Sequence, residues 1–236
     1  MNQDPQPSDE HRVDMGKLTR MVTGRFLGVA IFLGLMFFLP AGTFLYWQAW
    51  VYLAILLTPM LLVVIYLLKN DPELLERRMR TREKHLPQRV VILSSVVVML
   101  AIFMLPGFDK RYGWSSVPTS VVIVADLLVL LGYGLFALVL RENPYASRVV
   151  EVEKDQKIIT TGPYAVVRHP MYVGIGILYI FTPLALGSYW GMIPSALLPL
   201  FLIARILNEE KVLLKELEGY KEYTQRVKYR LLPGIW

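Results

Sequence analysis

The feature that most restricts the fold of this chain is a series of long apolar blocks. Four of them lie in the first 140 residues, at Phe26–Trp47, Ala49–Leu68, Val90–Pro106 and Val117–Leu140. A helix needs about 20 apolar residues to cross a bilayer, and inside lipid its backbone polar groups have to be satisfied within the structure. The composition agrees, with 55% hydrophobic residues and a mean hydropathy of +0.45. We therefore predict an all-α, polytopic integral membrane protein.

The last apolar region, 171–207, is too long for a single helix. The sequence LGSYWG at 186–191 divides it into Tyr172–Ala185 and Met192–Leu207, which we expect to form a hairpin. This brings the total to about six hydrophobic helical segments. Beyond the hairpin, 208–236 is charged and has apolar residues spaced as on one face of a helix. That spacing predicts a C-terminal amphipathic helix on the membrane or against the core.

The basic residues predict the orientation of the chain. Of the 25 lysines and arginines, 23 fall in the four segments 1–25, 69–89, 141–168 and 205–230. The other two are Lys110 and Arg111, between the third and fourth blocks. Because cytoplasmic loops of membrane proteins are enriched in these residues, we expect both termini and 141–168 to face the cytosol. The polar segment 1–25 is predicted to be a flexible cytosolic tail.

Composition also excludes several kinds of site. The chain has no cysteine, which rules out disulfides, a thiol nucleophile and thiolate zinc sites. Its three histidines are too scattered for a metal cluster, so no metal is expected. The net charge of +6 is attributed to cytoplasmic loops rather than to binding of nucleic acid. Asp126 lies inside the fourth block, where we expect it to avoid lipid and to make a structural hydrogen bond between helices.

A dense polar cluster, GPYAVVRHPMYVG at 162–174, precedes the hairpin. Pro170 suits the first turn of a helix. Arg168 and His169 are therefore predicted to lie just before a helix amino terminus, where unpaired N–H groups attract anions.

A second polar group lies on the far arm of the hairpin. Arg205 and Glu209 are four residues apart, on one face of a helix that leaves the bilayer. The hairpin returns this pair and the cluster at 162–174 to the same edge of the membrane. Taken singly, each group is explained by interfacial anchoring or by an ordinary helix ion pair. Together they favour a binding site.

The cluster at 162–174, the later R-x-x-x-E-E at 205–210 and the ending GYKEYTQRVKYRLLPGIW resemble the isoprenylcysteine carboxyl methyltransferase family. The wider group with this C-terminal half includes the phospholipid methyltransferases and, more distantly, the sterol reductases. The resemblance covers about 141–236. It implies that this part is a methyltransferase-like region of cytosolic cofactor-binding loops and a transmembrane hairpin, preceded by a four-helix transmembrane region at 26–140.

The resemblance implies S-adenosylmethionine as the cofactor and assigns residues to it. The residues implied to enclose the cofactor are Lys157, Ile158, Ile159, Tyr164, Arg168, His169, Tyr172 and Glu209. Arg205 is implied to hold the carboxylate of the methyl acceptor, so that Arg205 and Glu209 form the catalytic pair. A carboxylate is already deprotonated at neutral pH and needs no general base, and an arginine can hold it with two hydrogen bonds.

The implied acceptor is a lipidic or prenylated molecule that enters from the bilayer. Met171 stands at the variable position of the Arg-His-Pro-x-Tyr segment, where relatives often have serine or asparagine, so a small prenyl-type lipid and a protein are equal candidates. Three alternatives stay open: an NADPH-dependent sterol-type reductase, a phospholipid N-methyltransferase and a non-catalytic scaffold. The reductases are considerably longer chains, and NADPH would need a further basic clamp for its 2′-phosphate.

Overall fold

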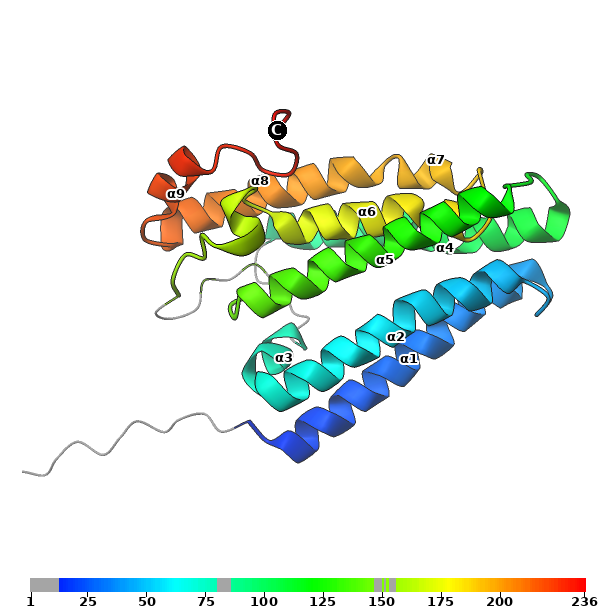
Figure 1. Ribbon diagram of the computed structural model, residues 1–236, viewed down its shortest axis with the longest axis horizontal. Coiled ribbons are helices and arrows are strands. Elements are labelled where there is room, and N and C mark those ends of the chain that lie inside the picture. Colours follow the sequence, from blue (N-terminus) through cyan, green and yellow to red (C-terminus); the bar gives the residue numbers. More distant parts are fainter. Residues whose placement is uncertain (1–12, 80–85, 147–149, 151, 153–155) are drawn as a thin grey trace, which may run out of the picture.

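The computed structural model describes residues 13–79, 86–146, 150, 152 and 156–236. Within these residues the regular structure is helical, without a strand (Figure 1). The elements are α1 (Met15–Ala41), α2 (Trp47–Asn70), α3 (Pro72–Arg78), α4 (Leu86–Tyr112), α5 (Thr119–Glu142), the 3₁₀ turn η1 (Gly162–Ala165), α6 (Pro170–Ala185), α7 (Met192–Ser195), α8 (Leu198–Glu216) and α9 (Tyr220–Arg226). In the described residues, five stretches are long and apolar enough to cross a membrane: α1, α2, α4, α5 and α7–α8. The predicted all-α, polytopic membrane fold is confirmed.

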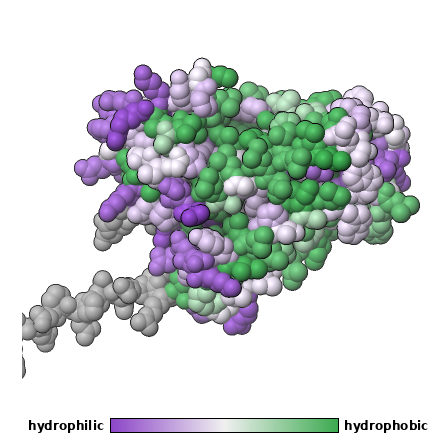
Figure 2. Space-filling model, viewed as in Figure 1, coloured by the Kyte–Doolittle hydropathy of each residue, from purple (hydrophilic) through white to green (hydrophobic). Residues whose placement is uncertain are grey.

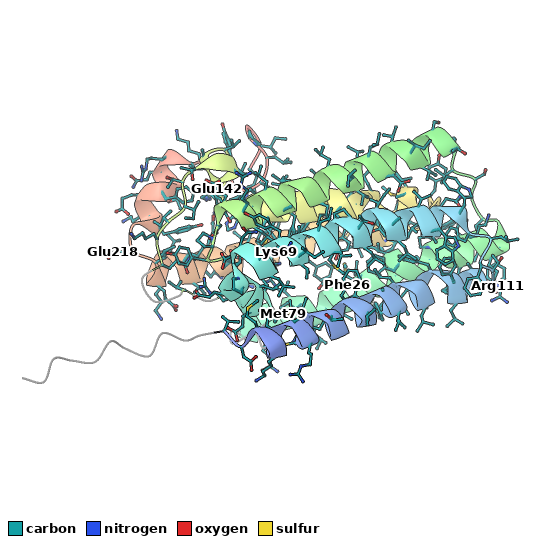
Figure 3. All side chains as sticks on the ribbon, turned by 60° about the horizontal axis from the view of Figure 1, so that its bottom comes forward. Phe26, Lys69, Met79, Arg111, Glu142 and Glu218 are labelled. Carbon is teal, nitrogen blue, oxygen red and sulfur yellow. The ribbon has the colours of Figure 1, made fainter. Side chains whose placement is uncertain are left out.

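The long helices run roughly along one common direction (Figure 1). The hairpin of α1 and α2 lies beside a group formed by α4, α5, α6 and α8, and the most extensive helix pairing is between α5 and α6. Apolar side chains cover the middle of the bundle, whereas hydrophilic ones gather toward its ends (Figure 2). Lys69, Glu142 and Glu218 lie toward one end and Arg111 lies at the other (Figure 3). This distribution suits a bilayer around the middle of the bundle.

Helix α1 begins further toward the amino terminus than expected. The predicted tail covers 1–25, whereas α1 starts at Met15, and residues 1–12 lie outside the described part of the chain. The Asp14 carboxylate caps the helix by accepting a hydrogen bond of 3.0 Å from a first-turn amide. The first turn also buries Leu18 against an apolar cluster that includes residues of α3. The cap and this burial explain why the polar segment is helical.

Helix α4 runs past Pro106, where the sequence predicted its end, and continues to Tyr112. The added turns carry Asp109, which is 1% exposed. Its carboxylate accepts hydrogen bonds from the Ser115 amide at 2.7 Å and from the Ser188 hydroxyl at 2.5 Å. These contacts join the α4–α5 connection to the α6–α7 connection and hold the end of α4 in a helical turn.

The C-terminal region differs from the predicted arrangement. The second arm of the hairpin is divided into α7 and α8, and α8 continues to Glu216. The amphipathic helix predicted within 208–236 is divided between the end of α8 and α9, because Gly219 has a φ of +79° and separates the two helices. Such a left-handed backbone breaks a helix and is readily adopted only by glycine. The sequence VVEVEKDQKIIT at 149–160 is compatible with a short hairpin or an extended segment, and it falls partly outside the described residues.

Asp126 faces the protein rather than lipid, as expected for an ionisable group in a membrane helix. It is 5% exposed within α5. Its Oδ1 atom, however, has no hydrogen-bond partner in the described part of the chain. The interhelical hydrogen bond predicted for this residue is therefore not found at that oxygen.

Helices α5 and α6 approach closely at two glycines. A Cβ atom added to Gly132 would lie 2.8 Å from the carbonyl oxygen of Gly174, and one added to Gly174 would lie 2.8 Å from that of Gly132. Both contacts are with backbone, which cannot move aside as a flexible side chain can. Small residues allow membrane helices to pack at short distance. This contact fixes α6, whose first turn carries Tyr172.

We expect Gly132→Ala to destabilise the protein by about 1–3 kcal/mol, the usual cost of overpacking a close contact. Gly134→Ala is the matched control, because a Cβ at Gly134 meets nothing within 4 Å and alanine is the better helix former. Thermal unfolding of both variants in detergent measures the difference. Equal midpoints for the two variants would contradict the proposed role of the glycine contact.

Candidate functional site

A cavity lies where the end of α5, the start of α6, the C-terminal half of α8 and α9 come together. All nine residues predicted for the site border it: Lys157, Ile158, Ile159, Tyr164, Arg168, His169, Tyr172, Arg205 and Glu209. They come from the loop before η1, from η1 itself, from the turn into α6 and from α8. Residues about 50 positions apart in sequence thus share one cavity, while the role of each residue stays a prediction.

The cavity has a volume of about 120 Å³. Sites for small organic ligands are usually about 300–1,000 Å³, so a ligand of nucleoside size fits only if side chains at the rim move outward. Ile158, Leu213 and Leu217 supply apolar lining, and Tyr164 and Glu209 supply polar groups. The cavity therefore has both an apolar surface and hydrogen-bonding groups for a ligand.

The Tyr172 hydroxyl connects the two residues of the predicted catalytic pair. It donates a hydrogen bond of 2.5 Å to Oε2 of Glu209 and accepts one of 2.8 Å from Nε of Arg205. The Arg205 guanidinium also lies 5.9 Å from the centre of the Tyr172 ring. Tyr172 comes from α6, whereas its two partners come from α8. The helix pair predicted from the spacing of Arg205 and Glu209 is thus joined through a tyrosine of another helix.

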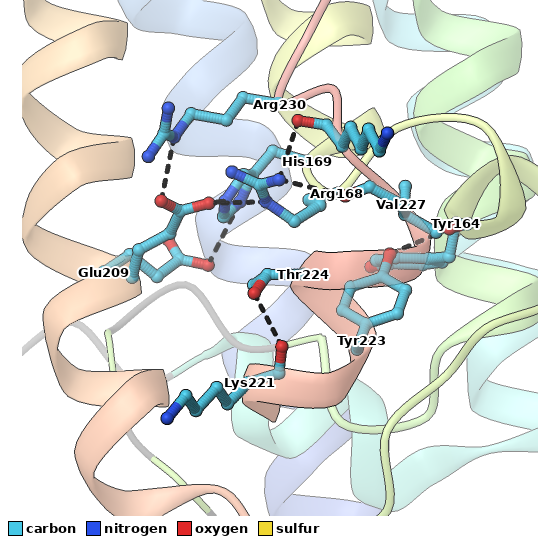
Figure 4. Close-up of polar contacts among 11 residues, drawn as sticks. Tyr164, Arg168, His169, Glu209, Lys221, Tyr223, Thr224, Val227 and Arg230 are labelled. Carbon is cyan, nitrogen blue, oxygen red and sulfur yellow. Dashed lines mark hydrogen bonds and ion pairs between the residues drawn. The ribbon is translucent and has the colours of Figure 1, made fainter. Parts of the chain in front are cut away.

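The neighbouring Glu210 is a buried carboxylate with three partners, a role that the sequence analysis did not assign. Its Oε1 atom accepts a hydrogen bond of 2.7 Å from Nε of Arg168 and lies 3.3 Å from Nε2 of His169. Its Oε2 atom accepts one of 2.8 Å from Nε of Arg230. Glu210 is 5% exposed, so these groups replace water around the buried charge. Arg168, His169 and Arg230 lie together next to Glu209 (Figure 4).

Arg168 also holds the C-terminal strap, which we define as residues 227–236. One terminal nitrogen of its guanidinium donates to the carbonyl oxygens of Val227 and Lys228, at 2.9 and 2.8 Å. The backbone amide of Arg168 donates to the carbonyl oxygen of Tyr229 at 2.9 Å, and the next amide donates to that of Arg230 at 3.0 Å. The described contacts of the Arg168 side chain are thus with the protein. Its predicted contact with a cofactor stays a prediction.

His169 lies between the two carboxylates of α8. Its Nδ1 atom is 3.8 Å from Oε1 of Glu209, and its Nε2 atom is the one close to Glu210. The imidazole is buried and directly precedes Pro170, the first residue of α6. Its position at the start of a helix agrees with the prediction from the Arg-His-Pro sequence.

Tyr164 is held by two residues that the sequence analysis left without a role. Its hydroxyl accepts a hydrogen bond of 2.8 Å from Nδ2 of Asn143, and its carbonyl oxygen accepts one of 2.8 Å from the hydroxyl of Tyr223. Burial raises the pKa of Tyr164 to about 12, against the opposite effect of the Asn143 hydrogen bond. The Tyr164 hydroxyl therefore stays protonated at any physiological pH and is available as a donor toward the cavity.

Some of these missed residues carry a signal in the sequence. The second glutamate of the E-E pair and the repeated tyrosines and arginines of GYKEYTQRVKYR are unusually dense for a surface tail. Their partners follow only from the fold, because the strap that carries Arg230 returns to the start of α6. Asn143 offers no comparable signal, since asparagine after a helix is ordinary.

The fold defines a multi-pass helical membrane protein, and this cavity lies at one end of its bundle. Comparison with known proteins gives a more specific class of membrane protein. The model of the phospholipid methyltransferase family matches residues 120–219, a segment that runs from α5 to the residue before α9. This segment is similar to that family, and the predicted resemblance to membrane methyltransferases is confirmed.

One curated relative is the protein-S-isoprenylcysteine O-methyltransferase of Schizosaccharomyces pombe. The two chains are 37% identical over 76 residues, which cover 31% of this chain and 32% of the relative. This chain therefore matches about a third of the length of that relative. The likeness concerns one region, and the activity of the whole relative does not transfer with it.

The Glu210 cluster gives a test of stability. Glu210→Gln removes the charge that faces Arg168 and Arg230, and leaving a buried cation unpaired costs about 3–5 kcal/mol. We expect a large fall in the thermal midpoint and easier proteolysis of the C-terminal strap. Glu216→Gln, on an exposed position of the same helix, is the control and should change the midpoint little. A Glu210→Gln variant as stable as this control would contradict the role given to the cluster.

Proposed function

We propose that this chain is an integral membrane methyltransferase that uses S-adenosylmethionine and methylates the carboxylate of a prenylcysteine-like or other lipidic acceptor. One observation carries the proposal. Arg205 and Glu209 border the same cavity and are joined by the Tyr172 hydroxyl. The segment that contains all three residues matches the phospholipid methyltransferase family.

The lining of the cavity suits a nucleoside-based cofactor that carries a positive charge. Ile158 and Leu213 offer apolar contact for an adenine ring, and Glu209 offers a carboxylate for a cationic group. When bound, S-adenosylmethionine supplies an activated methyl group on its sulfonium centre. The residues of the chain then have to align the donor with the acceptor and keep the site dry. Lys157, Ile159, Arg168 and His169 complete the proposed cofactor surface, the last two through their position at the start of α6.

Arg205 is the proposed group for the acceptor. It is half-buried where the apolar part of α8 ends, and a cation in this position benefits from an anionic partner. Its Nε atom is bound to Tyr172, which orients the guanidinium at the cavity. The planar fork of an arginine suits a carboxylate. Since a carboxylate needs no base, the chain has only to hold it in line with the methyl group.

The distribution of charge supports a cytosolic position of the site. The cavity is bordered by Lys157 and Arg168, which lie in one of the lysine- and arginine-rich segments. We expect a cysteine introduced at Lys110 to react with an impermeant maleimide added to intact cells, and one introduced at Lys221 to react only after lysis. Both positions are exposed in a chain that has no other cysteine. Labelling of position 221 in intact cells would contradict the orientation.

The family name of the matched segment favours a second candidate, methyl transfer to the amine of a phospholipid. A cation such as Arg205 beside an amine acceptor would repel its protonated form, which makes a carboxylate the better partner. Transfer assays with a farnesylated cysteine and with phosphatidylethanolamine separate the two acceptors. A sterol-type reductase would instead bind NADPH and leave S-adenosylhomocysteine unbound.

Arg205→Lys tests the acceptor role. Lysine keeps the charge but loses the fork, so we expect nearly unchanged binding of S-adenosylhomocysteine in calorimetry and a loss of transfer to farnesylated cysteine of about 10–100-fold, the value of one good polar contact. Arg226→Lys, exposed on α9, is the matched control. If Arg205 only pairs with its neighbours, lysine can replace it, and wild-type turnover of Arg205→Lys would refute the acceptor role.

A further inference from the structure

Tyr220, at the start of α9, borders the cavity and has a buried hydroxyl without a partner among the described residues. The residue is 4% exposed and belongs to the cavity lining. Its hydroxyl oxygen has no hydrogen-bond partner among the described residues. Buried polar groups are nearly always hydrogen-bonded, because leaving one unpaired destabilises the fold. Such a hydroxyl at the wall of a ligand cavity indicates a group that the ligand completes.

The neighbouring Tyr223 is a comparison, because its hydroxyl has a hydrogen-bond partner. It lies three residues further along α9, is 2% exposed and also borders the cavity. Its ring centre is 5.8 Å from that of Tyr220. Its hydroxyl donates a hydrogen bond of 2.8 Å to the carbonyl oxygen of Tyr164. The two tyrosines are similarly buried, but only the Tyr223 hydroxyl has a hydrogen-bond partner among the described residues.

The Tyr220 ring is held in place by apolar packing. It belongs to a cluster with Leu217, Tyr223 and Val227, against which Ile158 and Leu213 also pack. This cluster leaves the ring little freedom to carry its hydroxyl out to solvent. A hydrogen-bond partner for this hydroxyl therefore has to be supplied by a group that enters the site.

The electrostatic surroundings restrict what that partner is. Burial raises the pKa of Tyr220 far above its ordinary value, and the carboxylates of Glu210 and Glu209 raise it further. The hydroxyl is therefore protonated at every working pH. The Arg168 cation has the opposite effect on this pKa but acts less strongly than the two carboxylates, so an anion is disfavoured beside the hydroxyl. A neutral hydroxyl, a ring nitrogen or an ammonium group is compatible.

We propose that the Tyr220 hydroxyl is a cofactor contact, which hydrogen-bonds a neutral or cationic polar group of the S-adenosyl ligand and contributes to its affinity. This assignment rests on the proposed function. The ribose, adenine and amino groups of such a ligand are all of the required kind, and its carboxylate is not. Binding then satisfies a hydroxyl that is unpaired in the protein alone, so that affinity is gained without disturbing the fold.

Tyr220→Phe and Tyr223→Phe test the proposal, because each removes one hydroxyl and keeps the ring. In calorimetry of the full chain in detergent, we expect Tyr220→Phe to weaken binding of S-adenosylhomocysteine about 10-fold or more. Its thermal midpoint without ligand should equal or exceed that of wild type, because an unpaired buried hydroxyl is lost. Tyr223→Phe should instead lower the midpoint, because its hydrogen bond to Tyr164 is lost.

The outcomes separate this inference from the proposed function. If the wild type binds S-adenosylhomocysteine and Tyr220→Phe binds it equally well, the contact is refuted and the proposed function stands. A fall in the thermal midpoint of Tyr220→Phe with unchanged affinity would likewise overturn the contact and make the hydroxyl structural. If the wild type binds no S-adenosylhomocysteine, the proposed function fails, and the contact fails with it.

Discussion

The buried carboxylate of Glu210 is the interaction on which the arrangement of the site depends. It joins α8 to the residues before α6 through Arg168 and His169, and to the C-terminal strap through Arg230. A buried charge is costly unless its partners surround it, so these three segments adopt their positions together. Because the strap also accepts hydrogen bonds from Arg168, the start of α6 is held from two sides.

Glu209 and Glu210 are adjacent in α8 and have different partners. Successive residues of a helix point about 100° apart, so Glu209 reaches the Tyr172 hydroxyl at the cavity while Glu210 reaches Arg230 of the strap. His169 lies close to both. The contacts of the strap and those of the cavity therefore start from adjacent residues of α8, and both lie in the six-residue stretch 205–210.

The location of the candidate site could be predicted from the sequence, but its contacts could not. A hairpin has to return its two arms to one edge of the membrane, and the cavity there is bordered by Tyr164, Tyr172 and Arg205 as expected. The spacing of Arg205 and Glu209 suggested a direct helix pair, whereas Tyr172 joins them from α6. Such a contact depends on the distance between two helices, which spacing along one helix does not contain.

The sequence by itself determined the membrane class and the approximate membrane segments. The backbone polar groups of a long apolar block have to be satisfied in lipid, and a helix satisfies them within the segment. The spacing of apolar residues did not indicate the break after α8, which depends on the left-handed backbone of Gly219. Only the tertiary structure decided which polar groups meet. Arg168 and Arg230 are 62 positions apart and share one carboxylate, and the hydroxyl of Tyr220 is unpaired while that of Tyr223 is bonded. Hydrogen bonds act over about 3 Å, and at that range only the packing of the helices decides which polar groups find a partner.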